Sequence, residues 1–182
     1  MKQTNKKTSV MKKWISLLAV LTLMVGVTAC GSDKPDDLPA SENASATKSF
    51  TLIASAGAAS RSEIAFSLSD FAAISEYVKY VSNVIIQTTS YVEVSGITTS
   101  QTVELQNVTL SLKSDSKKKI VLPVIDSNEK FMELTQLTFL QEIMNEIYRR
   151  GSSTVVLTYT STHNLTSPVT LAIKLDGRFT FN

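Results

Sequence analysis

From Ser49 onward, apolar and polar side chains alternate along most of the chain, a pattern typical of strands that bury one face. The alternation begins at Phe50 and returns at residues 64–68. Six further segments have the same character, at residues 83–89, 90–95, 101–112, 119–125, 154–160 and 168–175. Because short connections separate these segments, we expect neighbouring strands to pair antiparallel.

Two local patterns refine this prediction. Between Leu105 and Val108 the apolar positions change parity, which predicts a β-bulge near Gln106 and Asn107. Further along, the pair 176–177 is Asp-Gly, which suits a two-residue type I′ hairpin turn because both residue types tolerate positive φ.

Two segments instead repeat apolar residues at helical spacing. The first runs from Asp70 to Val81, with Ser69 as the N-cap. The second runs from about Met132 to Arg150, with basic residues in its last turn and Gly151 directly after it. Its apolar stripe comprises Leu134, Leu137, Leu140, Ile143 or Met144, and Ile147. We therefore predict a mostly β (α+β) fold, in which residues 49–182 form one antiparallel β-sandwich-like domain with two helices packed on one face or end.

The amino-terminal residues differ sharply from this domain. Lys12 and Lys13 precede a 15-residue apolar stretch, Trp14 to Thr28. A membrane-spanning helix needs roughly 20 apolar residues, so this stretch is short for a permanent anchor. Its charged start and small-residue end are typical of a secretory signal peptide over residues 1–29, with translation starting at either Met1 or Met11.

The end of that segment, Val27-Thr28-Ala29-Cys30-Gly31, resembles the lipobox of bacterial lipoproteins. In that family the cysteine thiol receives a diacylglycerol, the signal peptidase cuts before the cysteine, and the new amino terminus is acylated. The resemblance implies that Cys30 is lipidated and holds the protein in the cell envelope, with the outer membrane as the expected location. Each buried acyl methylene contributes about 0.8 kcal/mol to such anchoring.

Residues 31–48 are rich in Ser, Ala, Asp and Pro and have almost no bulky apolar side chains. Such a segment buries too little surface to offset its ordering entropy, so we predict a disordered tether over residues 30–48. Its early acidic residues, Asp33, Asp36 and Asp37, resemble a signal that exports some Gram-negative lipoproteins to the cell surface. Acidic residues are also common in ordinary linkers, so a periplasmic location remains an alternative.

Charge and composition exclude several classes of protein. The chain has 18 basic and 16 acidic residues, but five of its lysines precede Cys30 and no acidic residue does. The chain from Cys30 onward therefore carries about three net negative charges, whereas a nucleic-acid-binding protein needs a basic surface. A single cysteine excludes disulfide scaffolds, zinc fingers and iron–sulfur proteins, and we expect no metal or cofactor.

The sequence offers few groups for catalysis. His163 is the only histidine and lies in a polar stretch between two predicted strands, without partners at metal-ligand spacing. No Gly-x-Ser-x-Gly motif supports a catalytic triad. Glu142 and Glu146 are one helical turn apart, but we expect them to lie on a solvated helix face. The chain is therefore predicted to be no enzyme, with a hydrolase as a minor alternative.

Binding residues are more plausible. Lys117, Lys118 and Lys119 occupy a predicted hairpin tip, where they would either contact anionic groups or blunt an edge strand. Tyr80, Tyr91 and Tyr159 are candidates for a ligand face. We expect a non-catalytic binding module for a glycan or an envelope protein. The alternative is a structural part of a surface complex that pairs through an edge strand at Arg178 to Asn182.

Overall fold

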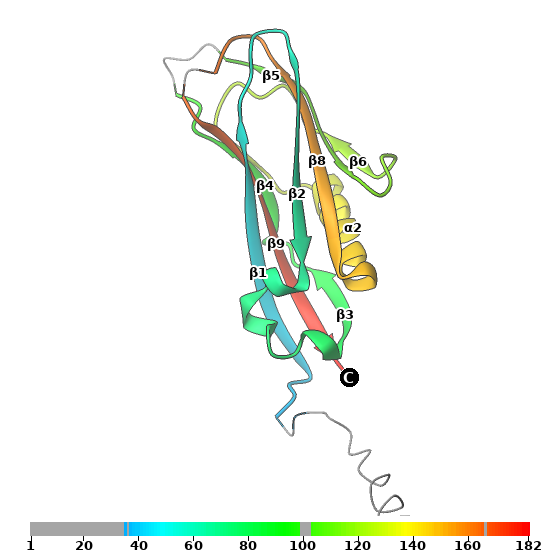
Figure 1. Ribbon diagram of the computed structural model, residues 1–182. Helices are drawn as coiled ribbons and strands as arrows, with labels where there is room; N and C mark the ends of the chain where they lie inside the picture. The colour runs from blue at the N-terminus through cyan, green and yellow to red at the C-terminus, as the bar shows by residue number, and fades with distance from the viewer. Residues whose placement is uncertain (1–34, 36, 99–102, 166) are drawn as a thin grey trace, which may run out of the picture. The chain divides into compact units, whose positions relative to one another are not determined.

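The computed structural model describes residues 35, 37–98, 103–165 and 167–182. The chain divides into two units, Met1–Asp37 and Leu38–Asn182. All strands and helices of the described residues belong to the second unit (Figure 1). The predicted signal peptide, Cys30 and the following residues through 34 lie outside the described residues.

One sheet of the folded unit has five strands and is built around its C-terminal strand. Its strands are β1 (Ser41–Leu52), β3 (Val81–Ile86), β4 (Tyr91–Ser95), β7 (Glu129–Phe131) and β9 (Val169–Phe181). β1 pairs with one side of β9, while β3 and β4 share the other side, and β7 pairs with β4. All of these pairs are antiparallel, as predicted, but each joins strands that are distant in the sequence rather than neighbours linked by a short connection.

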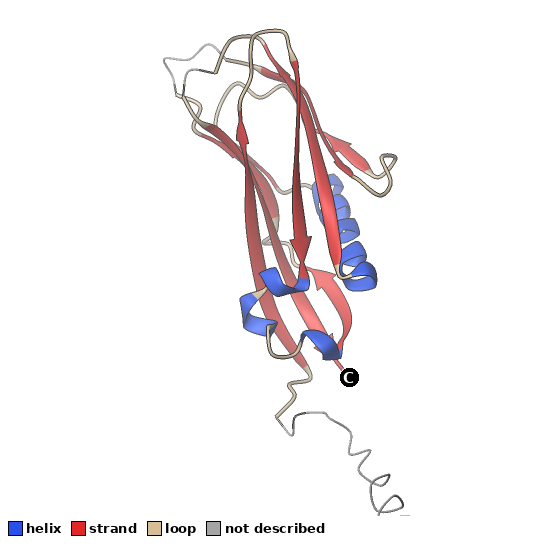
Figure 2. Cartoon of the chain, in the orientation of Figure 1, coloured by secondary structure: helices blue, strands red, loops and turns tan. Residues whose placement is uncertain are grey.

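The second sheet has four strands in the order β2-β8-β5-β6. They are β2 (Ala59–Ser67), β8 (Ser152–Ser161), β5 (Leu105–Leu112) and β6 (Lys119–Val121). The core contains fully buried residues from both sheets, such as Leu110 and Leu157 from this one and Leu171 and Phe179 from the other. The prediction of a mostly β, sandwich-like domain is confirmed (Figure 2).

α2 (Leu134–Arg150) is the only α-helix of the described residues. It packs mainly against β3 and β8, so it joins the two sheets along one side of the domain (Figure 1). The helix ends as predicted, because Gly151 takes a left-handed conformation with φ 80° and donates its amide to the carbonyl of Ile147. Its buried residues are Gln136, Phe139, Leu140, Ile143, Met144 and Ile147.

The predicted helix over residues 70–81 is wrong. This segment instead contains three short 3₁₀ turns, η1 (Leu68–Asp70), η2 (Ala72–Ile74) and η3 (Val78–Tyr80). Phe71 separates the first two turns and packs edge-on against Phe179, with the ring centroids 5.0 Å apart. Burial of Phe71 and Ile74 in the core outweighs the weak preference of the segment for a continuous helix.

The predicted bulge in β5 is confirmed. Gln106 pairs with Thr160 and Thr109 pairs with Thr158, so two residues of β5 stand opposite one of β8. Asn107 sits inside the bulge with a φ of 54°, a conformation that asparagine adopts more easily than most residues.

The predicted hairpin at 176–177 is wrong, because β9 continues through both residues. Gly177 is extended, and a side chain there would collide with the methyl group of Met144 on α2. The glycine therefore serves the close approach of helix and strand rather than a turn. As a consequence, Arg178 to Phe181 lie in the central strand, with β1 on one side and β3 on the other. The predicted edge strand at Arg178 to Asn182 is wrong for the same reason.

The predicted disordered tether is also wrong from Ser41 onward, because residues 41–48 form the first part of β1. Small side chains are sufficient here, since Ala44 and Ala46 are buried while Ser45 and Thr47 are exposed. The strand is stabilised by its pairing with β9, which short-range composition does not reveal. The folded unit therefore begins at Leu38 rather than at residue 49.

Candidate binding groove

A groove lies between α2 and the hairpin that joins β5 to β6. The hairpin turn is shaped by Asp115, which accepts the backbone amide of Lys117 on its side chain and that of Lys118 on its carbonyl. Lys118 reaches from the hairpin to Glu142 on the helix, where Nζ and Oε2 are 2.5 Å apart. This ion pair borders two hollows, since both residues line each of them. The two hollows together form the hairpin–helix groove.

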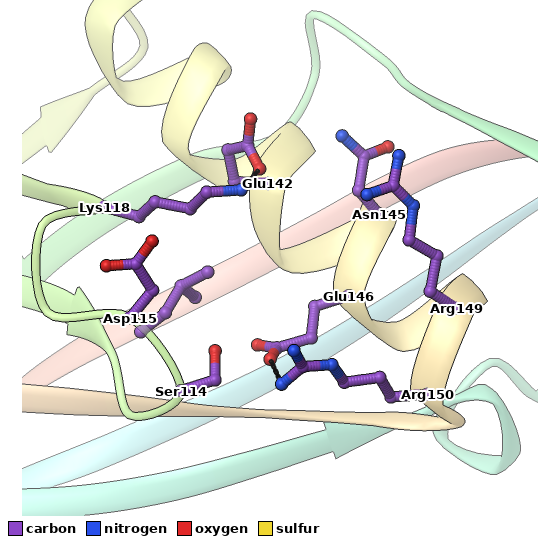
Figure 3. A pocket seen from close by; sticks show the side chains of 9 residues that line it. Ser114, Asp115, Lys118, Glu142, Asn145, Glu146, Arg149 and Arg150 are labelled. Carbon is purple, nitrogen blue, oxygen red and sulfur yellow. Dashed lines mark hydrogen bonds and ion pairs between the residues drawn. The ribbon is translucent and has the colours of Figure 1, made fainter.

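The first hollow is polar and has a volume of about 140 Å³. It is lined by Leu112, Ser114, Asp115, Lys118, Glu142, Asn145, Glu146, Arg149 and Arg150 (Figure 3). Glu146 accepts a hydrogen bond from Ser153 at 2.6 Å and pairs with Arg150 at 3.0 Å. Arg149 is turned away from that pair in Figure 3.

The second hollow is larger, about 410 Å³, and more apolar. It is lined by Lys117, Lys118, Lys119, Ile120, Leu134, Thr135, Thr138, Phe139 and Glu142. Leu134 stands at its rim and is 80% exposed, so its predicted place in the buried stripe of the helix is wrong. The contacts of α2 with β3 and β8 turn Phe139 inward and leave Leu134 beyond the edge of the core.

The groove carries a surplus of positive charge. Lys118 and Arg150 are neutralised by Glu142 and Glu146. Lys117, Lys119 and Arg149 also line the groove, and none of the carboxylates of the described residues forms an ion pair with them. Among the described residues that line the groove, only the Asp115 carboxylate remains to oppose these three cations, so the groove is positive in a chain that is net negative after Cys30. Lys117 and Lys118 lie in the turn at the hairpin tip, as predicted, while Lys119 is the first residue of β6, and all three are exposed.

The predicted carboxylate pair is occupied by structural interactions. Glu142 is bonded to Lys118, and both oxygens of Glu146 have partners, Arg150 and Ser153. The oxygen atoms that would exchange protons with a substrate therefore hold the helix to the hairpin and to β8. This arrangement suits stability and binding better than acid–base chemistry.

The three candidate tyrosines do not form one face. Tyr159 is 2% exposed, and its hydroxyl both donates to the carbonyl and accepts from the amide of Ile53. Tyr80 lies in η3, while Tyr91 lies in β4 of the five-stranded sheet. Tyr91 does have cations over its ring, with Lys130 Nζ at 4.1 Å and Lys174 Nζ at 5.8 Å from the centroid. None of the three tyrosines lines the hairpin–helix groove.

His163 is exposed in the connection between β8 and β9, where its Nδ1 lies 3.0 Å from the hydroxyl of Thr162. In the part of the chain that the structure describes, no three His, Cys, Asp or Glu side chains cluster as metal ligands would. Over the same residues, no helix combines the length and the apolar character needed to cross a bilayer.

Taken together, the geometry defines an antiparallel two-sheet β-domain with one helix and a positively charged groove beside that helix. No family model matches the chain, and no curated protein matches it either. Among solved structures, the chain is similar to one from Desmodium yellow mottle tymovirus, with 13% identity and a TM-score of 0.37. That match covers 82% of this chain and 95% of the other, but a likeness this slight supports no conclusion about function.

Proposed function

We propose that this chain is a bacterial lipoprotein, anchored in the cell envelope through Cys30, whose folded unit is a non-catalytic binding module. The observation that carries the proposal is Val27-Thr28-Ala29-Cys30-Gly31 behind a basic and apolar leader. The outer membrane is the proposed location, on either its surface or its periplasmic face. The ligand is a protein or glycan of the envelope, and the hairpin–helix groove is its proposed site.

The early start of the fold sharpens this proposal. Only residues 31–37 separate Cys30 from Leu38, where the folded unit begins. Fully extended, that connection spans at most about 28 Å. A lipidated Cys30 would thus keep the folded unit close to the bilayer, which favours a ligand that is itself part of the envelope.

The anchor is tested by labelled palmitate in cells that express the full chain or its Cys30→Ala variant. Incorporation and membrane fractionation are expected for the unchanged chain and should be lost in the variant. Ser32→Ala is the matched control, because it alters a small polar residue two positions away and should leave both results unchanged. Label that persists without Cys30, or a processed chain that starts elsewhere, would contradict the proposal.

A second candidate, a structural part of a surface complex that pairs through an edge strand, is favoured by a different strand from the one predicted. β6 forms an outer strand of the four-stranded sheet, next to the hairpin–helix groove.

Protease treatment of intact cells distinguishes the two proposed faces of the outer membrane, because a surface-exposed domain should be digested and a periplasmic one should survive.

A further inference from the structure

β6 presents unpaired backbone groups along the groove. Within the hairpin, the amide of Leu112 donates to the carbonyl of Lys118, and the amide of Leu122 donates to the carbonyl of Val108. Backbone groups alternate in direction along an antiparallel strand, so those of Lys119 and Val121 point away from β5. Across residues 37–98, 103–165 and 167–182, no hydrogen-bond partner for these groups is present.

Apolar surface lies next to this open edge. The larger hollow of the groove extends from Ile120 of β6 to Leu134 and Phe139 of α2. Leu134 is 80% exposed and provides the accessible apolar surface of this hollow, because Ile120 and Phe139 are buried. A strand added beside β6 would direct alternate side chains inward over the helix, where apolar residues would cover this surface.

The charges select the kind of strand that fits. Lys117 and Lys119 border the same hollow and form no ion pair with the described carboxylates. The chain from Cys30 onward is net negative, so these lysines form a local positive site on an acidic molecule. Acidic side chains on the outward positions of an added strand would complement them, whereas basic ones would be repelled.

We propose that β6 and the hairpin–helix groove bind an extended segment of a partner protein in which acidic and apolar residues alternate. The segment adds to the sheet as a strand, with its apolar residues against Leu134 and its acidic residues beside Lys117 and Lys119. This inference rests on the proposed binding function but not on the lipid anchor. A peptide fits better than a sugar, because the only aromatic ring of the groove, Phe139, is 3% exposed and offers no stacking surface.

The test is selection from a displayed library of random seven-residue peptides, with the full chain purified in mild detergent as the target. Enriched peptides should alternate acidic and apolar residues. The double variant Lys117→Glu with Lys119→Glu should raise the Kd of the best peptide by about tenfold or more. N-methylation of one alternate set of peptide amides should weaken binding by about tenfold, while methylation of the other set should not, because only one set faces β6.

A charge-matched control is Arg61→Glu with Lys130→Glu, two exposed positions that do not line the groove. The control should leave the Kd unchanged, and circular dichroism should show that both double variants remain folded. Equal weakening by the two double variants would overturn the proposal, as would no enrichment or enrichment without acidic residues. Binding to an anionic glycan array that needs Lys117 and Lys119, without peptide selection, would overturn it in favour of a sugar. Loss of the Cys30 anchor alone would leave peptide selection intact, so the two proposals fail separately.

Discussion

α2 lies beside the edges of two strands, β3 and β6. Among the described residues, it forms hydrogen bonds with the first edge but not with the second. The free edge of β3 is bonded by the helix: the amide of Ile86 donates to Gln141 at 2.7 Å, and Tyr148 donates its hydroxyl to the carbonyl of Ser82 at 2.6 Å. The Gln141 amide nitrogen also lies 3.4 Å from the carbonyl of Val84. Beside β6, by contrast, the same helix leaves a hollow and no backbone partner among the described residues.

β1 shows a further way to close an edge. Lys48 faces inward from this outer strand, bonds the carbonyl of Ala65 on β2 and pairs with Asp70 at 2.8 Å. An inward-pointing lysine satisfies its neighbours and blocks the addition of another strand. The edge of β3 is thus bonded by side chains of α2, and β1 carries an inward-pointing lysine, while the edge of β6 is short, open and flanked by lysines. Those lysines oppose pairing with a second basic edge and favour an acidic partner.

Among substitutions at these strand edges, Gln141→Leu should destabilise the protein most, because it leaves the backbone amide of Ile86 without its hydrogen-bond acceptor. Loss of that bond should lower the free energy of unfolding by about 1–3 kcal/mol. Urea denaturation measures the change. The control is Gln87→Leu, because the Gln87 side chain has no hydrogen-bond partner among the described residues. A stable Gln141→Leu variant would show that the helix does not hold the β3 edge.

Asp70→Asn tests the ion pair that holds Lys48 of β1 in its inward position. The substitution should lower the free energy of unfolding by about 1 kcal/mol at neutral pH, because the ion pair is partly exposed. Partial burial tends to raise the pKa of Asp70, but hydrogen bonds from Lys48 and from the amide and hydroxyl of Ser67 outweigh it and lower the pKa below the ordinary 3.8. The stability that the carboxylate contributes is therefore present at neutral pH and lost as the pH falls below about 4.

Thermal melts from pH 7 to pH 3 check this prediction. The gap between the unchanged chain and Asp70→Asn should narrow as the solution is acidified. Asp115→Asn is the control, because Asp115 is exposed and its carboxylate accepts only a backbone amide. A gap that stays constant down to pH 3 would mean that the charge of Asp70 contributes nothing.

The smallest effect is expected at the open edge. Lys117→Gln with Lys119→Gln should change the free energy of unfolding by no more than about 0.5 kcal/mol, because both side chains are exposed and form no ion pair with the described carboxylates. Urea denaturation of this double variant and of Gln141→Leu under the same conditions compares the two losses of stability. A loss as large as that of Gln141→Leu would show that the lysines stabilise the fold instead of leaving an edge free.

Local patterns predicted the parts of the fold whose signal is local. Alternation located most of the strands, and the parity change at Gln106 and Asn107 located the bulge. The helix ending at Gly151 was equally visible, because its apolar spacing, basic last turn and glycine agree. The sequence predicted only part of the groove. Lys117 to Lys119 form a recognisable basic run, but the roles of Leu134 and Gln141 depend on the orientation of the helix.

The errors have a common cause. Residues 41–48 resemble a linker in composition, yet they form a strand because β9 lies beside them. Asp-Gly at 176–177 resembles a turn, yet it lies within β9, where the side chain of Met144 packs closely over Gly177. In each case a partner distant in sequence overrides a correct local preference.

By itself, the sequence determined the periods of most strands, the bulge, the position of α2 and the resemblance of Cys30 to a lipid-attachment site, because each depends on residues close together in the chain. Only the tertiary structure decided that α2 bonds the edge of β3, that β1 carries an inward-pointing lysine and that the edge of β6 is left open. That choice depends on where α2 and Lys48 place their side chains, and those positions are set by packing between segments far apart in the chain.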